Sequence, residues 1–123
     1  MAPAGSSPDK LQALLAGLAL PPEQTYPAVA NFLDAAQTAE MVQAVHSHFG
    51  RLDVWLHMVG GYKGGAAVPA FDPADLRAML EQHLYTTLNT ARAVVPLLPA
   101  ARWGRIVAVT AAGGQTPPAS NAP

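Results

Sequence analysis

Apolar residues recur with helical spacing in two stretches of the first fifty residues. In Pro8–Leu18 the leucines fall on one face, and Ser7 is placed to cap a helix that begins at Pro8. The second stretch follows Asp34, whose spacing to Gln37 fits a capping box, and it ends at Gly50, a residue suited to a left-handed helix end. We therefore predict two amphipathic helices here.

A third and longer helix is predicted to begin at Asp72, with Pro73 in its first turn. Its apolar residues keep a helical repeat for about six turns, and they are Leu76, Leu80, Leu84, Leu88, Ala91, Val95 and Leu98. Pro96 ends or kinks this helix, because proline cannot continue the hydrogen-bond ladder. The sequence leaves open whether the stripe faces a sheet or a partner chain.

Short apolar runs alternate with these helices and predict strands at 26–32, 52–59 and 106–110. Such alternation is typical of an α/β fold, here a partial doubly wound, Rossmann-like parallel sheet of about three strands with flanking helices. We expect residues 1–7 to form a disordered arm, residues 8–110 an incomplete domain, and residues 111–123 a loop or tail rich in Gly, Pro and Ser.

Composition narrows the class of protein. The 123 residues allow one domain, and a net charge of −1 provides no field for nucleic acid or an anionic membrane. No cysteine is present, and no run reaches the roughly 18 apolar residues of a membrane span. A cytoplasmic location is the expectation. Charged residues make up only 12%, against about 25% in typical domains. This low fraction suggests that much of the chain is the interior of a larger protein or assembly.

Histidines invite a metal interpretation, which the spacing argues against. His46 and His48 point about 200° apart on a helix, so they cannot converge on one ion. We predict no metal site. The glycine-rich stretch Gly60–Gly65 is expected to be a flexible loop over a cofactor face or, alternatively, a backbone nest for phosphate.

Three motifs, in order and at the right spacing, resemble the short-chain dehydrogenase/reductase family. FGRLDVWLHMVG at 49–60 resembles the approach to the family's fourth strand, commonly FGRLDVLVNNAG. RAVVP at 92–96 is similar to the end of the long helix that follows. GRIVAVT at 104–110, followed by AAG, resembles the family's GRIVNISSxAG strand and turn. VGGYKGG at 59–65 is also similar to a stretch of dihydropteridine reductases.

The resemblance implies an NAD or NADP cofactor and hydride transfer to or from a small-molecule carbonyl or alcohol. Carried over residue by residue, it implies cofactor contacts from Asn31, Phe32, Met58, Val59, Gly60 and Thr110. It also implies a homo-oligomer formed through the Leu76–Leu98 helix. Nucleic acid and membrane are not expected as partners.

The catalytic positions depart from the family pattern, and none is intact. The helix asparagine falls on His83 and the serine on Ala111. The tyrosine would follow Pro123 directly, and its lysine would lie beyond. No glycine-spaced phosphate loop occurs before Asn31. Dihydropteridine reductases also lack the serine, so Ala111 alone does not imply that the site is catalytically inactive.

We therefore interpret the chain as a partial member of the family that is inactive alone. The alternative is a non-catalytic dimerisation or interaction module derived from that fold, and a third hypothesis is an enzyme that uses His83 or Lys63. In the doubly wound order 3-2-1-4-5-6, the strand at 26–32 would not neighbour the strand at 52–59. Either these two strands pair directly, or another chain completes the sheet, or the chain folds poorly.

Overall fold

The computed structural model describes residues 1–63, 67–98 and 103–110. Its elements, in chain order, are β1 (Ala4–Gly5), α1 (Pro8–Leu18), β2 (Ala28–Val29), α2 (Ala35–Phe49), β3 (Val54–His57), α3 (Pro73–Leu80), α4 (Thr86–Val94) and β4 (Arg105–Ala108). All strands whose pairing is described run parallel to their neighbours. This confirms the predicted α/β class with parallel strands and flanking helices.

Local capping sets the ends of α1 and α2. Ser7 accepts a hydrogen bond from the backbone N–H of Lys10 at the start of α1. The Asp34 carboxylate accepts from the N–H groups of Ala36 and Gln37, at 2.9 and 3.0 Å. α2 ends at Gly50, whose φ of +70° lies in the left-handed region that favours glycine. These signals depend on adjacent residues, which is why the sequence predicted both helices at their observed bounds.

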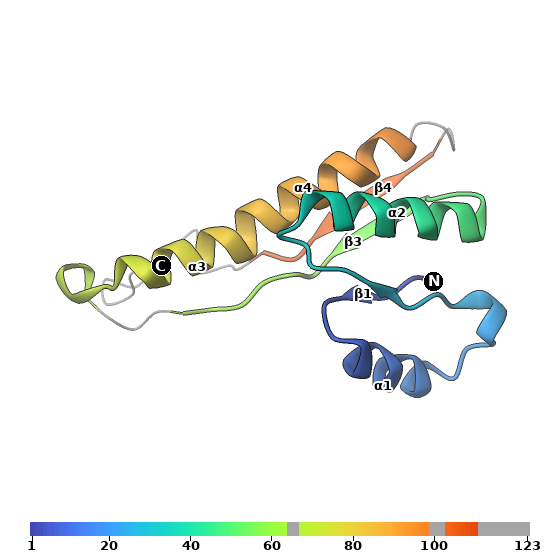
Figure 1. Cartoon of the computed structure of the whole chain (residues 1–123), viewed down its shortest axis with the longest axis horizontal. Coiled ribbons are helices and arrows are strands. Elements are labelled where there is room, and N and C mark those ends of the chain that lie inside the picture. The colour runs from blue at the N-terminus through green and yellow to red at the C-terminus, as the bar shows by residue number, and fades with distance from the viewer. Residues whose placement is uncertain (64–66, 99–102, 111–123) are drawn as a thin grey trace.

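The long third helix is continuous but not uniform. It begins at the Asp72 cap, widens into a π-helical turn at Glu81–Tyr85, and resumes as α4. Pro96 lies in the 3₁₀ turn Val95–Leu97 that ends it. Figure 1 shows α3 and α4 as one long rod that extends well beyond the strands. The helix predicted from Asp72 to the proline is thus present, with an irregularity that the spacing did not indicate.

Within the described residues, the four strands form two parallel pairs rather than one sheet. β1 pairs with β2, Ala4 opposite Ala28, and β3 pairs with β4, Trp55 opposite Ile106. Of the three alternatives left open by the sequence, the direct pairing of the 26–32 strand with the 52–59 strand is not found in the described residues. The expectation of about three strands also needs correction, because the chain's first residues provide a fourth.

The predicted disordered arm is the origin of that extra strand. The carbonyl of Pro3 accepts from the N–H of Ala28 at 2.9 Å, and that of Gly5 accepts from Ala30 at 3.1 Å. Composition rich in Ala, Pro and Gly suggested disorder, but backbone pairing does not depend on side chains. The predicted arm at 1–7 is thus ordered against β2. The predicted tail at 111–123 lies outside the described residues.

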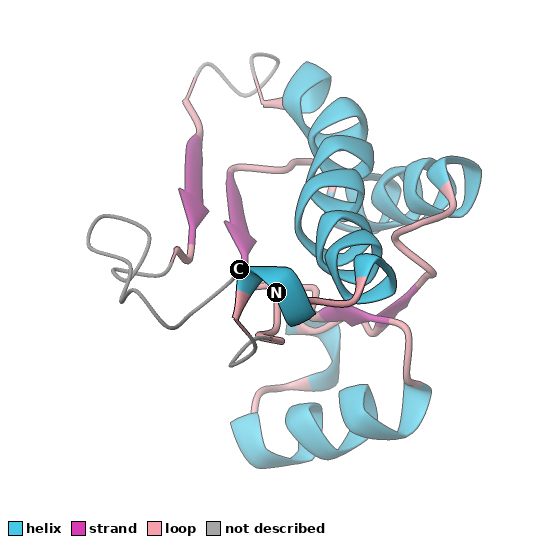
Figure 2. Cartoon of the chain, turned by 90° about the vertical axis from the view of Figure 1, so that its left-hand side faces the viewer, coloured by secondary structure: helices cyan, strands magenta, loops and turns pink. Residues whose placement is uncertain are grey.

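Helices cover both faces of the β1–β2 pair, with α1 on one side and α2 and α4 on the other (Figures 1 and 2). The core lies on the α2 side. Its buried members are Ala28, Ala30, Met41, Val42, Val45, Val94 and Leu98. The four described residues of β4 are all exposed. Helices of the described chain therefore cover the β3–β4 pair only in part.

The apolar stripe of the long helix lies mainly on the surface. Leu98 is buried, but the other large members are about half exposed, and they are Leu76, Leu80, Leu84, Leu88 and Val95. The helix instead packs on α2 through Thr86, Thr90 and Val94, which are buried. In the described part of the chain, no helix has the length and apolarity that a membrane crossing requires.

Replacing Asp34 by alanine should lower the free energy of unfolding by about 1 kcal/mol, because the first turn of α2 loses its cap. The variant also loses the 3.1 Å hydrogen bond from the Gln37 amide to Asp34. The measurement is urea unfolding followed by circular dichroism. The matched control is Glu40→Ala, which removes an exposed carboxylate from the same helix. Equal effects of the two substitutions would contradict the capping role.

Candidate functional site

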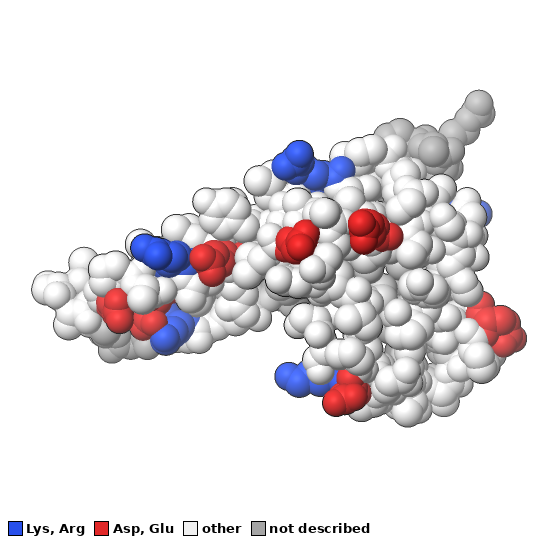
Figure 3. All heavy atoms as spheres, viewed as in Figure 1, with Lys and Arg blue, Asp and Glu red and all other residues white. Residues whose placement is uncertain are grey.

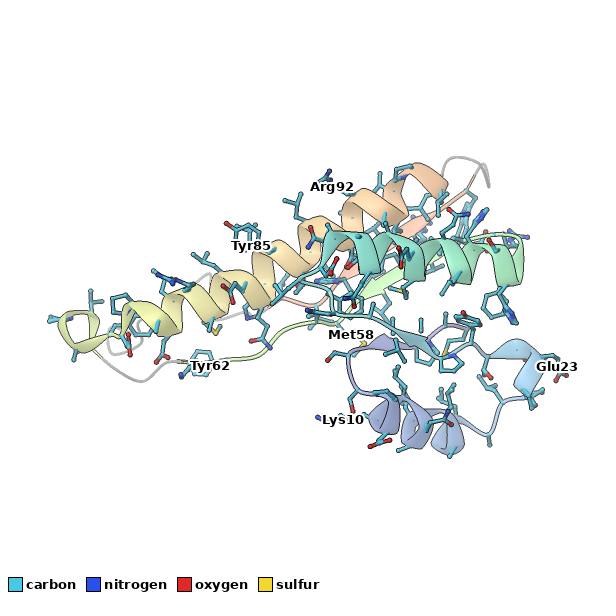
Figure 4. All side chains as sticks on the ribbon, viewed as in Figure 1. Lys10, Glu23, Met58, Tyr62, Tyr85 and Arg92 are labelled. Atoms are coloured by element: carbon cyan, nitrogen blue, oxygen red, sulfur yellow. The ribbon has the colours of Figure 1, made fainter. Side chains whose placement is uncertain are left out.

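The residues predicted to contact a cofactor follow the carboxyl ends of three parallel strands. Asn31 and Phe32 follow β2, Met58 to Gly60 follow β3, and Thr110 follows β4. In open α/β sheets, ligands bind outside the carboxyl ends of the strands. Met58 is exposed where β3 leaves the sheet (Figure 4). The structure thus places all six predicted residues at strand ends, with Thr110 also exposed.

The turn after β2 is held by three amide side chains, those of Asn31, Gln37 and Asn89. The Asn31 Oδ1 accepts from the backbone N–H of Leu33 at 3.1 Å, and the Asn31 N–H donates to Gln37 Oε1 at 3.3 Å. From α4, Asn89 Nδ2 donates to the carbonyl of Phe32 at 2.9 Å and to that of Leu33 at 3.3 Å. Asn31 therefore already shapes its own turn. Asn89, which the sequence did not single out, fixes the turn to the helix layer.

The segment after β3 passes close to the π-helical turn. A Cβ atom on Gly60 would lie 3.0 Å from His83 Cε1, and one on Gly61 would lie 2.8 Å from Gln82 Nε2. His83 Nε2 donates to the Gly61 carbonyl at 2.7 Å. A side chain added at either glycine would therefore require the side chains of His83 and Gln82 to move, and neither glycine has a positive φ. The resemblance predicts a cofactor contact at Gly60; the structure shows that Gly60 and Gly61 both lie close to side chains of the π-helical turn.

A hydrogen-bonded chain connects the buried end of β3 to the same turn. His57 Nε2 lies 2.8 Å from Thr87 Oγ1, and the Thr87 hydroxyl donates to the carbonyl of His83. Because that hydroxyl has a single proton, His57 Nε2 must be the donor to Thr87. The side chains of Thr87 and His83 therefore link the core, the helix and the loop at Gly61.

Burial sets the protonation of His57. The ring is buried, and this lowers its pKa because the charged form is poorly solvated; the nearby His83 lowers it further. The neutral ring with a proton on Nε2 satisfies the hydrogen bond to Thr87. The neutral His57 ring therefore links the end of β3 to α4 through Thr87.

Charged groups near the strand ends are paired. Lys63 forms an ion pair with Asp75 at the start of α3, which raises the pKa of Lys63 through a hydrogen bond and charge attraction. A lysine held cationic in this way is a poor general base. Figure 3 shows charged side chains of both signs lying singly or in mixed groups on this face. The hypothesis of an enzyme using Lys63 therefore gains no support from this pair.

The predicted catalytic positions have different outcomes. His83 is present on the long helix at the centre of the π-helical turn, a feature often found at functional sites. Ala111 lies outside the described residues. Across the described ranges, no group of three or more His, Asp or Glu side chains is arranged to hold a metal ion.

Comparison with known proteins places the chain in a family. The model of the short chain dehydrogenase family matches residues 1–123, and the chain belongs to this family. It is 32% identical over 93 residues to the oxidoreductase BOA17 of Botryotinia fuckeliana, a match that covers 76% of this chain and 34% of that protein.

Solved structures show the same fold. Serine dehydrogenase from Escherichia coli superposes with a TM-score of 0.85 at 20% identity, covering 97% of this chain and 54% of that one. A short-chain dehydrogenase/reductase from Burkholderia xenovorans gives 0.81 at 21% identity, covering 93% and 45%. ElxO with NADP bound gives 0.85 at 18% identity, covering 97% and 48%. The chain spans about a third of the curated relative and about half of these structures.

His57 should make the fold sensitive to acid. Its pKa in the folded chain lies below the unfolded value of about 6.5, so the unfolded chain binds more protons at low pH. The contribution of the neutral His57 ring to the free energy of unfolding is complete above pH 6.5, and it is lost as the pH falls through the pKa of His57 in the folded chain. Urea unfolding at pH 7.5 and 5.5 should show this loss in the native sequence and a smaller loss in His57→Gln.

His48→Gln is the control for this comparison, since it replaces an exposed histidine and leaves His57 in place. An unchanged pH dependence in His57→Gln would show that the buried ring does not account for the effect.

Proposed function

We propose that this chain forms the central part of an NAD- or NADP-dependent oxidoreductase acting on a small carbonyl or alcohol compound. The observation that supports this most is that Phe32, Met58, Gly60 and Thr110 each follow the carboxyl end of a strand in a member of the short chain dehydrogenase family. A structural neighbour was solved with NADP bound. When bound, the nicotinamide would supply the hydride.

The strand ends offer groups that fit a dinucleotide. Gly60 and Gly61 keep a side-chain-free backbone segment beside the π-helical turn. Exposed Met58 and partly buried Phe32 provide apolar surface for flat rings. Asn31 and Thr110 supply polar groups nearby. We assign these residues to holding the cofactor, and we place the protein in the cytoplasm, where such cofactors are abundant.

We further propose that the chain does not transfer hydride by itself. His83 stands at the family's asparagine position, but its Nε2 is occupied by the Gly61 carbonyl at 2.7 Å. Tyr62 follows Gly60 by two residues, but neither Tyr62 nor Tyr85 is at the position where the resemblance predicts the catalytic tyrosine, and the two lie on different sides of the long helix (Figure 4). Proton donation to a substrate oxygen requires a group within hydrogen-bond reach of it.

A second candidate function is assembly through the long helix. Leu84, Leu88 and Val95 are about half exposed on one helix, although large apolar residues at such spacing usually pack against something. This surface favours self-association, in line with the predicted interaction module. We propose a homodimer in which these residues meet their counterparts on a second copy.

Cofactor binding is testable on the isotopically labelled chain by nuclear magnetic resonance. Adding NAD⁺, NADP⁺, NADH or NADPH in separate titrations should shift the amide signals of Phe32, Met58, Val59, Gly60 and Thr110. In Gly60→Val the shifts should fall at least fivefold, because the added side chain collides with His83. Glu23→Gln, far from the strand ends (Figure 4), is the control.

Shifts confined to other regions, or no shift at millimolar dinucleotide, would reject the cofactor assignment. Steady turnover of NADH or NADPH by the purified chain, with a panel of aldehydes and ketones, would reject the proposed inactivity.

The assembly proposal predicts a different result. The double variant Leu84→Glu with Leu88→Glu should convert a dimer to a monomer in light scattering after size-exclusion chromatography. The control is Val68→Glu, which places the same charge on an exposed apolar residue away from the long helix. A dimer with a dissociation constant in the low micromolar range would be mostly assembled at about 100 μM chain. A native chain that is monomeric at that concentration would therefore contradict a stable dimer.

A further inference from the structure

One edge of β2 is open, on the side away from β1. In the described residues β2 pairs with β1 alone, and the N–H groups of Ala28 and Ala30 donate to carbonyls in and just before β1, at 2.9 and 3.1 Å. Because backbone groups alternate along a parallel strand, the N–H and C=O of Val29 point away from β1. A strand edge of this kind offers backbone donors and acceptors to an extended chain.

The open edge is short. At its start, Pro27 lacks an N–H and offers only its carbonyl. At its end, the N–H of Asn31 donates to Gln37 Oε1 at 3.3 Å, and the carbonyl of Asn31 accepts from the N–H of Asp34 at 2.9 Å. The open backbone groups therefore run from the Pro27 carbonyl to Val29. This edge accommodates a short extended segment rather than a long strand.

A groove of about 270 Å³ lies between this edge and α2. Pro27 and Val29 line its strand side, and Glu40, Met41 and Ala44 line its helix side. Figure 1 shows α2 running alongside this part of the chain. When an extended peptide adds to a sheet edge, main-chain hydrogen bonds give affinity and pockets for alternate side chains give specificity. The edge and the groove together provide both features.

The two faces of β2 determine which peptide side chains would enter the groove. Ala28 and Ala30 are buried in the core with residues of α2, so the half-exposed Val29 side chain lies on the opposite face. Residues directly opposite each other on neighbouring strands share a face. In a peptide paired with Val29, the residues before and after the pairing residue therefore point toward α2. The groove thus receives two side chains that are two positions apart in the peptide.

The helix side of the groove has an apolar part and an acidic part. Met41 is buried and Ala44 is half-buried, and they form the apolar part. Glu40 is exposed, and neither ion pair of the described residues includes it. Among the described residues no lysine or arginine lines the groove, and Figure 3 shows acidic side chains where α2 borders β2. A cationic side chain two positions from an apolar one complements both parts.

We propose that this groove binds an extended segment of a partner protein that carries a lysine or arginine two positions from an apolar residue. The segment adds to the strand edge at Val29, its cation meets the Glu40 carboxylate, and its apolar side chain contacts Met41. Residues 111–123 of this chain do not match, because they contain no lysine or arginine. A second copy paired through its own β2 would bring two Glu40 carboxylates together, which is unfavourable. The inference goes beyond the proposed function and requires no dinucleotide.

The test uses the full chain and the synthetic peptide acetyl-Thr-Leu-Thr-Lys-Thr-Leu-Thr-amide, whose leucines and lysine share one face of a strand. At saturating peptide, amide hydrogen exchange at Val29 should slow about fivefold or more, because its N–H gains a backbone acceptor. Exchange at Ala4, whose N–H points away from β2, should not change. A peptide with N-methyl groups on the two threonines beside the lysine should give no protection, because it lacks the backbone donor for the Val29 carbonyl.

A charge-reversal experiment tests the recognition of the cation, with affinities measured by nuclear magnetic resonance titration. Glu40→Gln should weaken binding of the lysine peptide about threefold, the effect of one exposed ion pair. Glu40→Lys should weaken it about tenfold or more, and should bind a peptide with glutamate in place of lysine more tightly than the native chain does. Glu23→Gln, the same change in the 3₁₀ turn Pro22–Gln24 outside the groove, is the matched control and should leave the affinity unchanged. Circular dichroism checks that these exposed substitutions keep the fold.

The proposal is overturned if the lysine peptide does not bind, if the N-methylated peptide binds equally well, or if the lysine and glutamate peptides bind the native chain with the same affinity. Protection of Val29 that rises with chain concentration in the absence of peptide would also overturn it, because the edge would then belong to a second copy. Failure of the cofactor titrations leaves this result untouched, because no dinucleotide enters the peptide experiments.

Discussion

The packing of α2 against α4 is the contact on which the described structure depends. α2 follows β2, and α4 leads to β4, so their contact joins two strand pairs that share no ladder. The interface is rich in threonine. Thr38 is fully buried and donates to the Asp34 carbonyl at 2.7 Å, while Thr86 and Thr90 donate to carbonyls one turn earlier in their own helix. These internal bonds let hydroxyl groups lie in a core without unsatisfied polar atoms.

Features that depend on residues close together in the sequence could be predicted, whereas features that depend on distant residues could not. Ser7, Asp34 and Gly50 act on residues within one turn, and the helices they bound were predicted with their observed ends. β1 was missed because it forms by backbone pairing with Ala28 and Val29, more than twenty residues away, and its own residues give no strand pattern. The pairing of β3 with β4 spans some fifty residues, and no local pattern specifies it.

The candidate site divides in the same way. Gly60 was identified from a motif, and the structure gives its physical reason in the close approach of His83. Asn89 and Thr87 were not identified, because a polar residue on a helix gives no indication of a partner that is distant in sequence. Their roles, holding the turn at Phe32 and linking His57 to the π-helical turn, emerge only from the packing of the helix on the strand ends.

The π-helical turn also changes how the long helix meets any neighbour. Eight residues turn a regular α-helix by about 800°, which would leave Leu80 and Leu88 about 80° apart around the helix axis. The π-helical turn between them accommodates roughly one extra residue, or about 100°, so the two exposed leucines face in nearly the same direction. The widened turn thus keeps the exposed leucines on both sides of it on one face, which a single straight partner helix can follow.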